Sequence, residues 1–257
     1  DSGAHDSATG DAIIVDEHSY HSPEWFASQA SRFDAYPRCG AGVYFGEYSA
    51  NGYFAGQPQT EQGANTWKSA LGEAAFLTGC ERNSDVVRMT SYAPLLAHIP
   101  AKGWAQNLIE FNPAHVNPTV NYEVERLFST HLGDTTYAVS IEQTASRPAK
   151  HLYVSATGHD GDDACRYIKI VNISDSPVDV TLEIARGLAG LGASPSRPVR
   201  LEVTTLSANP TAKTTIGYRG EASGAFVPER RAYTLPSPSS LLAMKIKPYS
   251  VTLVVSR

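Results

Sequence analysis

The stretch Gly42-Val43-Tyr44-Phe45-Gly46-Glu47-Tyr48 decides how the rest of the chain is interpreted. The residues before Glu47 are glycine, valine or aromatic and carry no charge, which is typical of a strand buried on both faces, as in parallel sheets. Alternation along a strand predicts that Val43, Phe45 and Glu47 share one face. A carboxylate at the end of such a strand is costly to bury, so Glu47 needs hydrogen-bond donors or a chemical task. The alternative is that Glu47 caps a loop or pairs with an arginine.

Composition indicates a globular protein that binds neither nucleic acid nor membrane. The chain has 257 residues, of which 42% are hydrophobic, and this is ample for a core. Its net charge of -5 comes from 26 acidic and 21 basic side chains, and no block of lysine and arginine is present to neutralise phosphates. No apolar run reaches the length of about 18 residues that a membrane-spanning helix needs.

The cysteines and the first residues bear on compartment and on metal binding. Cys39, Cys80 and Cys165 are far apart and odd in number, which argues against a disulfide framework and matches no zinc spacing. We therefore expect free thiols and no metal. Residues 1–10 are polar and acidic, whereas a signal peptide is basic and then apolar. The unpaired cysteines slightly favour a cytoplasmic location, and nothing else in the sequence indicates the compartment.

The first half of the chain alternates apolar strands with helical segments. We expect strands at 12–20, 42–48 and 86–92, and helices at 22–36 and 66–81. Ser22 and Pro23 are typical of a helix start, as N-cap and first helical residue. This alternation predicts βα units joined by right-handed crossovers, which form a parallel sheet.

The second half changes to a β pattern after a long loop, which contains Trp104, and one more helix at 121–131. Short alternating segments then follow, separated by Gly, Pro, Asn and Asp. Strands of this length and spacing predict an antiparallel sandwich. The expected strands are 152–156, 167–172, 178–184, 199–205, 241–246 and 250–255.

Several motifs occur in an order that resembles one known family. They are Val15-Asp16-Glu17-His18-Ser19-Tyr20, Ser22-Pro23-Glu24-Trp25-Phe26, Gly46-Glu47-Tyr48, Glu81-Arg82-Asn83-Ser84-Asp85-Val86-Val87, Ser91-Tyr92-Ala93-Pro94-Leu95-Leu96-Ala97, and Asn121-Tyr122 followed by Leu127-Phe128-Ser129. Together they resemble the second half of an α-L-arabinofuranosidase of glycoside hydrolase family 51. The resemblance runs from about residue 12 to residue 133, and more loosely to Pro248-Tyr249-Ser250-Val251.

The resemblance implies an α/β plus all-β fold: residues 1–134 as the C-terminal part of a (β/α)8 TIM barrel, about strands six to eight, and residues 135–257 as an antiparallel β-sandwich. It implies a retaining glycosidase that releases terminal α-L-arabinofuranosyl groups from arabinan or arabinoxylan, needs no cofactor and favours homo-oligomers. By resemblance, Glu47 is the nucleophile, and His18 and Tyr20 hold it and the sugar. From its place at the end of the next strand, Tyr92 is expected to add a further contact. Trp104 stacks on the sugar or covers the barrel rim.

A retaining mechanism needs a second carboxyl group about 5–5.5 Å from the first. In the family this group is the glutamate of an Asn-Glu pair, and the chain contains no such pair. Glu17 is expected on the face opposite His18, Glu73 within a helix, and Asp85 at the wrong end of its strand. We therefore expect the rest of the barrel, with the acid/base glutamate, to come from other polypeptide, and this chain alone to be inactive.

Two other functions remain open from the sequence. The chain could be a non-catalytic carbohydrate-binding or assembly module in which the sandwich does the binding. It could also be a related clan A glycosidase that acts on pyranosides, because Gly46-Glu47-Tyr48 alone does not specify ring size.

Overall fold

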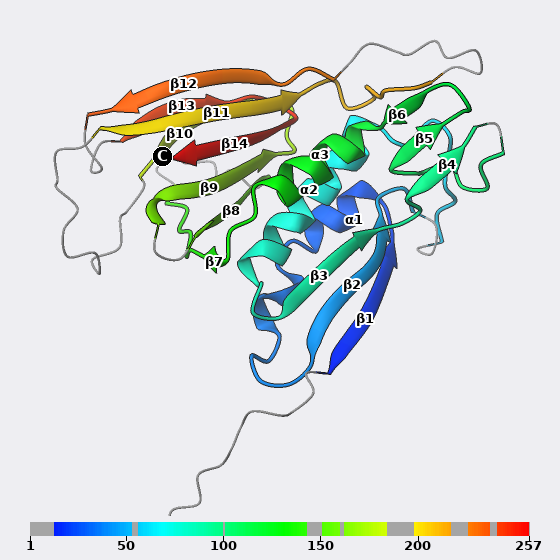
Figure 1. Ribbon diagram of the computed structural model, residues 1–257, viewed down its shortest axis with the longest axis horizontal. Helices are drawn as coiled ribbons and strands as arrows, with labels where there is room; N and C mark the ends of the chain where they lie inside the picture. The colour runs from blue at the N-terminus through cyan, green and yellow to red at the C-terminus, as the bar shows by residue number, and fades with distance from the viewer. Residues whose placement is uncertain are drawn as a thin grey trace, which may run out of the picture.

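A computed structural model describes residues 13–52, 56–99, 101–142, 151–159, 162–183, 198–216, 226–236 and 241–256. Its elements form layers, with a parallel sheet on one side, antiparallel strands on the other, and helices between them (Figure 1). The candidate site lies on the parallel sheet.

The parallel sheet is built from the strands expected in the first half of the chain. β1 (Ile14–Tyr20), β2 (Gly42–Ser49) and β3 (Val87–Tyr92) lie in the order β1-β2-β3, and both pairs are parallel. Within the described residues β1 and β3 pair only with β2, so both form sheet edges. The predicted βα alternation is confirmed for these elements.

The middle strand carries an irregularity that the sequence did not predict. On β1, Glu17 pairs with Phe45 and His18 pairs with Glu47, so the register skips Gly46. Val43 and Phe45 are buried in the core, whereas the side chain of Glu47 is 45% exposed. The expectation that these three residues share a face was therefore wrong, because a bulge turns Glu47 away from the face that strict alternation assigns to it.

Helices α1 (Pro23–Ser28) and α2 (Trp67–Arg82) connect these strands, with a short 3-10 helix, η1 (Arg32–Ala35), after α1. The predicted cap is confirmed, since the Ser22 hydroxyl accepts the Trp25 amide at 3.2 Å. Nearly all of α2 is buried because sheets lie on both sides of it (Figure 1). Its glycines allow the chain around α1 to pack closely on it: a Cβ on Gly79 would lie 2.1 Å from the carbonyl oxygen of Ala30, which follows α1.

The segment expected to be a long loop contains a small sheet. β4 (Leu96–His98), β5 (Ile109–Phe111) and β6 (Val116–Pro118) form it, with one parallel and one antiparallel pair. Strands of three residues are too short for alternation to reveal. α3 (Val120–Thr130) follows, capped by the Thr119 hydroxyl, close to the range predicted for this helix.

The remaining strands form the predicted antiparallel sandwich. A six-stranded sheet has the order β12-β11-β14-β9-β8-β7, and a two-stranded sheet, β10-β13, covers one of its faces. β12 was not expected, because Glu229-Arg230-Arg231 gives it a charged start. The bounds are β7 (Thr135–Thr136), β8 (Leu152–His159), β9 (Asp162–Asn172), β10 (Val178–Leu182), β11 (Val199–Ser207), β12 (Glu229–Leu235), β13 (Leu242–Ile246) and β14 (Ser250–Ser256).

The other face of the six-stranded sheet packs on the helices. Val171, Val251 and Leu253 belong to the same buried cluster as Phe45 and Phe76. A buried ion pair joins Lys169 of β9 to Glu81 of α2. The parallel sheet, the helices and the sandwich therefore share one continuous core. No helix in the described part of the chain is long and apolar enough to cross a membrane.

Candidate active site

The structure brings together three of the residues singled out in the sequence: Glu47, Tyr20 and His18. Tyr20 and His18 end β1, and Glu47 lies at the end of the neighbouring β2. The Tyr20 hydroxyl donates a hydrogen bond to Glu47 Oε2, and His18 Nδ1 lies 3.6 Å from the same oxygen. Because parallel strands end at one edge of a sheet, residues 27 positions apart meet here.

The environment of Tyr20 keeps it a hydrogen-bond donor. Only 6% of this residue is exposed. Burial raises its pKa, and so do the hydrogen bond to Glu47 and the Glu47 charge. The phenol therefore stays protonated at neutral pH and directs its O–H at the carboxylate. Glu47 itself is 45% exposed, so a ligand from solvent can reach it.

Asp16, two residues before His18 on β1, is a further member of this group. Its Oδ2 lies 2.9 Å from His18 Nε2, so the imidazole lies between the carboxylates of Asp16 and Glu47. Asp16 also explains why residue 46 is a glycine, because a Cβ at that position would lie 2.1 Å from Asp16 Oδ1. Period-2 alternation placing Asp16, His18 and Tyr20 on one face was the signal for this contact.

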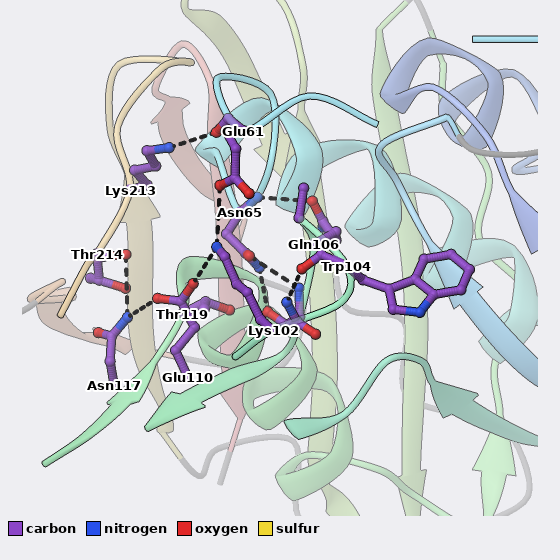
Figure 2. A network of polar contacts seen from close by, with 12 residues as sticks. Glu61, Asn65, Lys102, Trp104, Gln106, Glu110, Asn117, Thr119, Lys213 and Thr214 are labelled. Atoms are coloured by element: carbon purple, nitrogen blue, oxygen red, sulfur yellow. Dashed lines mark hydrogen bonds and ion pairs between the residues drawn. The ribbon is translucent and has the colours of Figure 1, made fainter. Parts of the chain in front are cut away.

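Trp104 joins the group through Tyr20. The two rings stack with centroids 5.8 Å apart and an interplanar angle of 30°. The indole points away from a polar network that fixes the neighbouring backbone (Figure 2). In that network the Asn107 side chain donates to the Trp104 carbonyl at 2.8 Å, and Asn65 exchanges hydrogen bonds with the Asn107 backbone.

The same network reaches the sandwich (Figure 2). Lys102 lies between Glu61 and Glu110, at 3.2 and 3.3 Å. Lys213, in the segment after β11, donates to the Glu61 carbonyl at 2.9 Å. The loop that carries Trp104 therefore contacts the parallel sheet through Tyr20 and the segment after β11 through Glu61 and Lys213.

Tyr92, the remaining candidate, does not join Glu47. Tyr92 is 8% exposed. The centroid of its ring lies 5.5 Å from that of Tyr48, and its hydroxyl accepts a hydrogen bond from Gln106 Nε2 at 2.8 Å. These contacts place it in the core behind β2. The expected contact of Tyr92 with a sugar is therefore not supported by its position.

The three carboxyl groups excluded as a second catalytic acid lie apart from the site. Glu17 pairs with Arg32 at 2.6 Å, on the face opposite His18, and Asp85 pairs with Arg38 at 3.1 Å. Glu73 is fully buried in α2. The residues that the structure describes contain no group of three or more His, Cys, Asp or Glu positioned to hold a metal ion.

Comparison with known proteins identifies the family. The family described as "Alpha-L-arabinofuranosidase C-terminal domain" matches residues 43–250. An extracellular exo-α-L-arabinofuranosidase of Streptomyces chartreusis is 45% identical over 121 residues, which are 47% of this chain and 13% of that protein. A probable α-L-arabinofuranosidase A of Aspergillus flavus is 33% identical over 181 residues, 68% of this chain and 26% of that protein.

A solved structure supports the same assignment. The arabinose-bound MgGH51 α-L-arabinofuranosidase superposes with a TM-score of 0.76 and 26% identity, over 95% of this chain and 36% of that one. The chain thus spans well under half the length of each of these relatives. The chain belongs to the α-L-arabinofuranosidases of glycoside hydrolase family 51, in which it matches the C-terminal portion.

Proposed function

We propose that this chain carries the nucleophile half of the active site of a retaining α-L-arabinofuranosidase. The observation that carries the proposal is the position of Glu47, at the carboxyl end of the middle parallel strand with Tyr20 donating to its carboxylate. A glycosidic nucleophile has to be ionised, oriented and open to the sugar. Hydrogen bonding to Tyr20 and partial exposure to solvent meet the last two needs.

In the proposed reaction, Glu47 attacks the anomeric carbon and forms a covalent glycosyl-enzyme as the leaving oxygen departs. Tyr20 orients the attacking carboxylate, and His18, held by Asp16, approaches the same oxygen. A second carboxylic acid, about 5–5.5 Å from Glu47, protonates the leaving group and then activates water. The indole of Trp104 offers a face on which a sugar can stack. The substrate is a terminal α-L-arabinofuranosyl group of an arabinan or arabinoxylan-type chain.

The second acid is proposed to come from polypeptide outside this chain. We assign residues 1–134 to the last strands of a (β/α)8 barrel and residues 135–257 to the sandwich. Among the described residues β1 and β3 pair only with β2, and this supports the assignment, because natural sheets generally protect an exposed edge. Ile14, Val15 and Met89 are 44–49% exposed on these edge strands. Added parallel strands would cover them, and this chain alone is expected to be inactive.

The test uses the complete enzyme, meaning this chain together with the polypeptide that supplies the second acid. Glu47→Gln should abolish nearly all hydrolysis of an aryl α-L-arabinofuranoside while arabinose binding persists. Glu17→Gln is the matched control, because Glu17 lies on the adjacent strand but faces Arg32. Full activity of the Glu47→Gln variant would overturn the proposal.

The alternative of a binding module based on the sandwich receives less support from the described residues. Helices pack on one face of the six-stranded sheet and β10-β13 packs on the other. Tyr137, which follows β7, is covered by the Arg166 guanidinium at 4.0 Å, and Tyr153 of β8 packs against the core. Neither forms an open aromatic platform for a sugar.

A further inference from the structure

The residues that follow Glu47 are buried although Glu47 is not. Tyr48, Ser49 and Ala50 are each 0% exposed, while the Glu47 side chain is 45% exposed. The bulge at Gly46 means that regular strand geometry does not fix the direction of Glu47. That direction depends on how the next residues are held.

Tyr48 is held by a carboxyl group on α3. Its hydroxyl donates to Glu125 Oε1 at 2.7 Å, and its ring packs between Phe26, Phe76 and Tyr92. The two residues are 77 positions apart in the sequence. Glu125 thus links the residue next to Glu47 to a helix that packs on the sandwich.

Ala50 is held by a second carboxyl group, on α2. Its amide donates to Glu73 Oε1 at 2.8 Å. The other oxygen, Oε2, accepts from the Asn121 side chain at 2.7 Å. A buried backbone amide that loses its acceptor is destabilising, so Glu73 stabilises this backbone conformation.

We propose that Glu125 and Glu73 are positioning residues for the reaction, which hold the backbone on the far side of Glu47 and so direct its carboxylate at the anomeric carbon. The inference rests on the proposed function. Neither group touches the sugar, and both act through residues 48–50. Small displacements of reacting groups are costly: an error of about 1 Å can slow a reaction about 100-fold.

The first test removes the acceptor for Tyr48 in the complete enzyme. Glu125→Leu and Tyr48→Phe should each lower kcat on an aryl α-L-arabinofuranoside by about 10- to 100-fold, with KM changed less than about threefold. Glu125→Gln keeps a carbonyl acceptor and should restore kcat to near the wild-type value. A purely structural role would lower the amount of folded enzyme but not the kcat of the enzyme that folds.

The second test reverses one hydrogen bond. Glu73→Gln can still accept from Ala50, but its new amide group faces the Asn121 amide, and two donors then oppose each other. Adding Asn121→Asp reverses that pair and restores an acceptor. We expect kcat to fall in Glu73→Gln and to recover at least fivefold in the double variant.

The control lies on the same helix. Glu123→Gln changes a carboxylate that pairs with Arg126 at the surface of α3, and kcat should not change. If Tyr48→Phe and Glu125→Leu keep kcat within about threefold of wild type while Glu47→Gln is inactive, this inference is overturned and the proposed function stands. If Glu47→Gln keeps full activity, the proposed function fails and the inference fails with it.

Discussion

Removing the amine of Lys169 should destabilise the protein more than almost any single surface change. Lys169 of β9 is 0% exposed and Glu81 of α2 is 7% exposed, and they form an ion pair across 88 residues of sequence. Burial raises the pKa of Glu81 and lowers that of Lys169, while each partner's charge opposes the shift of the other. The pair is therefore needed to keep both groups charged.

The size of the effect follows from what Lys169→Met leaves behind. Glu81 would keep the Ser155 hydroxyl, at 2.5 Å, as its donor among the described residues. Breaking a buried pair on one side costs about 3–5 kcal/mol. The free energy of unfolding measured in urea should fall by the same amount.

The assay is urea unfolding of the complete enzyme followed by tryptophan fluorescence, because Trp67 is fully buried at the start of α2. A second variant, Lys169→Met with Glu81→Leu, removes both charges and should recover most of the lost stability. Arg126→Met is the control, since Arg126 pairs at the surface. A loss below about 1 kcal/mol for Lys169→Met would refute the reasoning, because that is the size of a surface pair.

Three further predictions concern packing, pH and the rim of the site. Gly79→Ala should destabilise the folded protein by about 1–3 kcal/mol, because the new Cβ meets the Ala30 carbonyl oxygen. The control is Gly103→Ala, whose Cβ meets nothing within 4 Å, and thermal unfolding compares the two variants. Burial and the Glu125 charge raise the pKa of Glu73 to about 8. The folded state therefore holds this proton more tightly than the unfolded state does. The free energy of unfolding, measured in urea at each pH, should fall as pH rises from about 4.3 toward 8. In Glu73→Gln this pH dependence should be weaker. Trp104→Ala should raise KM at least fivefold and lower kcat less, while Trp104→Phe keeps a stacking ring; equal KM for both variants would argue against sugar stacking.

Much of the fold follows from local sequence patterns. The apolar runs at residues 12–20, 42–48 and 86–92 predicted the three parallel strands, and Ser22 and Pro23 predicted the start of α1. These signals succeed because burial on both faces and helix capping act over a few residues. The meeting of Glu47 with His18 and Tyr20 follows from the parallel order of the strands.

The features that were missed depend on distant residues. The bulge at Gly46 lies against Asp16 of another strand, and alternation within β2 alone assigned Glu47 to the wrong face. Tyr92 resembled a site residue by its place at a strand end, but packing on Tyr48 keeps it in the core. Glu73 was excluded as a catalytic acid because it is helical, yet nothing in the sequence placed it beside Ala50.

The most direct measurement of the central claim is the identity of the residue that bonds to the sugar. The complete enzyme is quenched in acid during turnover of an aryl α-L-arabinofuranoside, digested with trypsin and examined by peptide mass mapping. The peptide between Arg38 and Lys68 contains both Glu47 and Glu61, so fragmentation has to locate the sugar. An arabinosyl ester on Glu47 is the predicted result, and an ester on any other carboxylate, or an inverted product with no covalent intermediate, would contradict it.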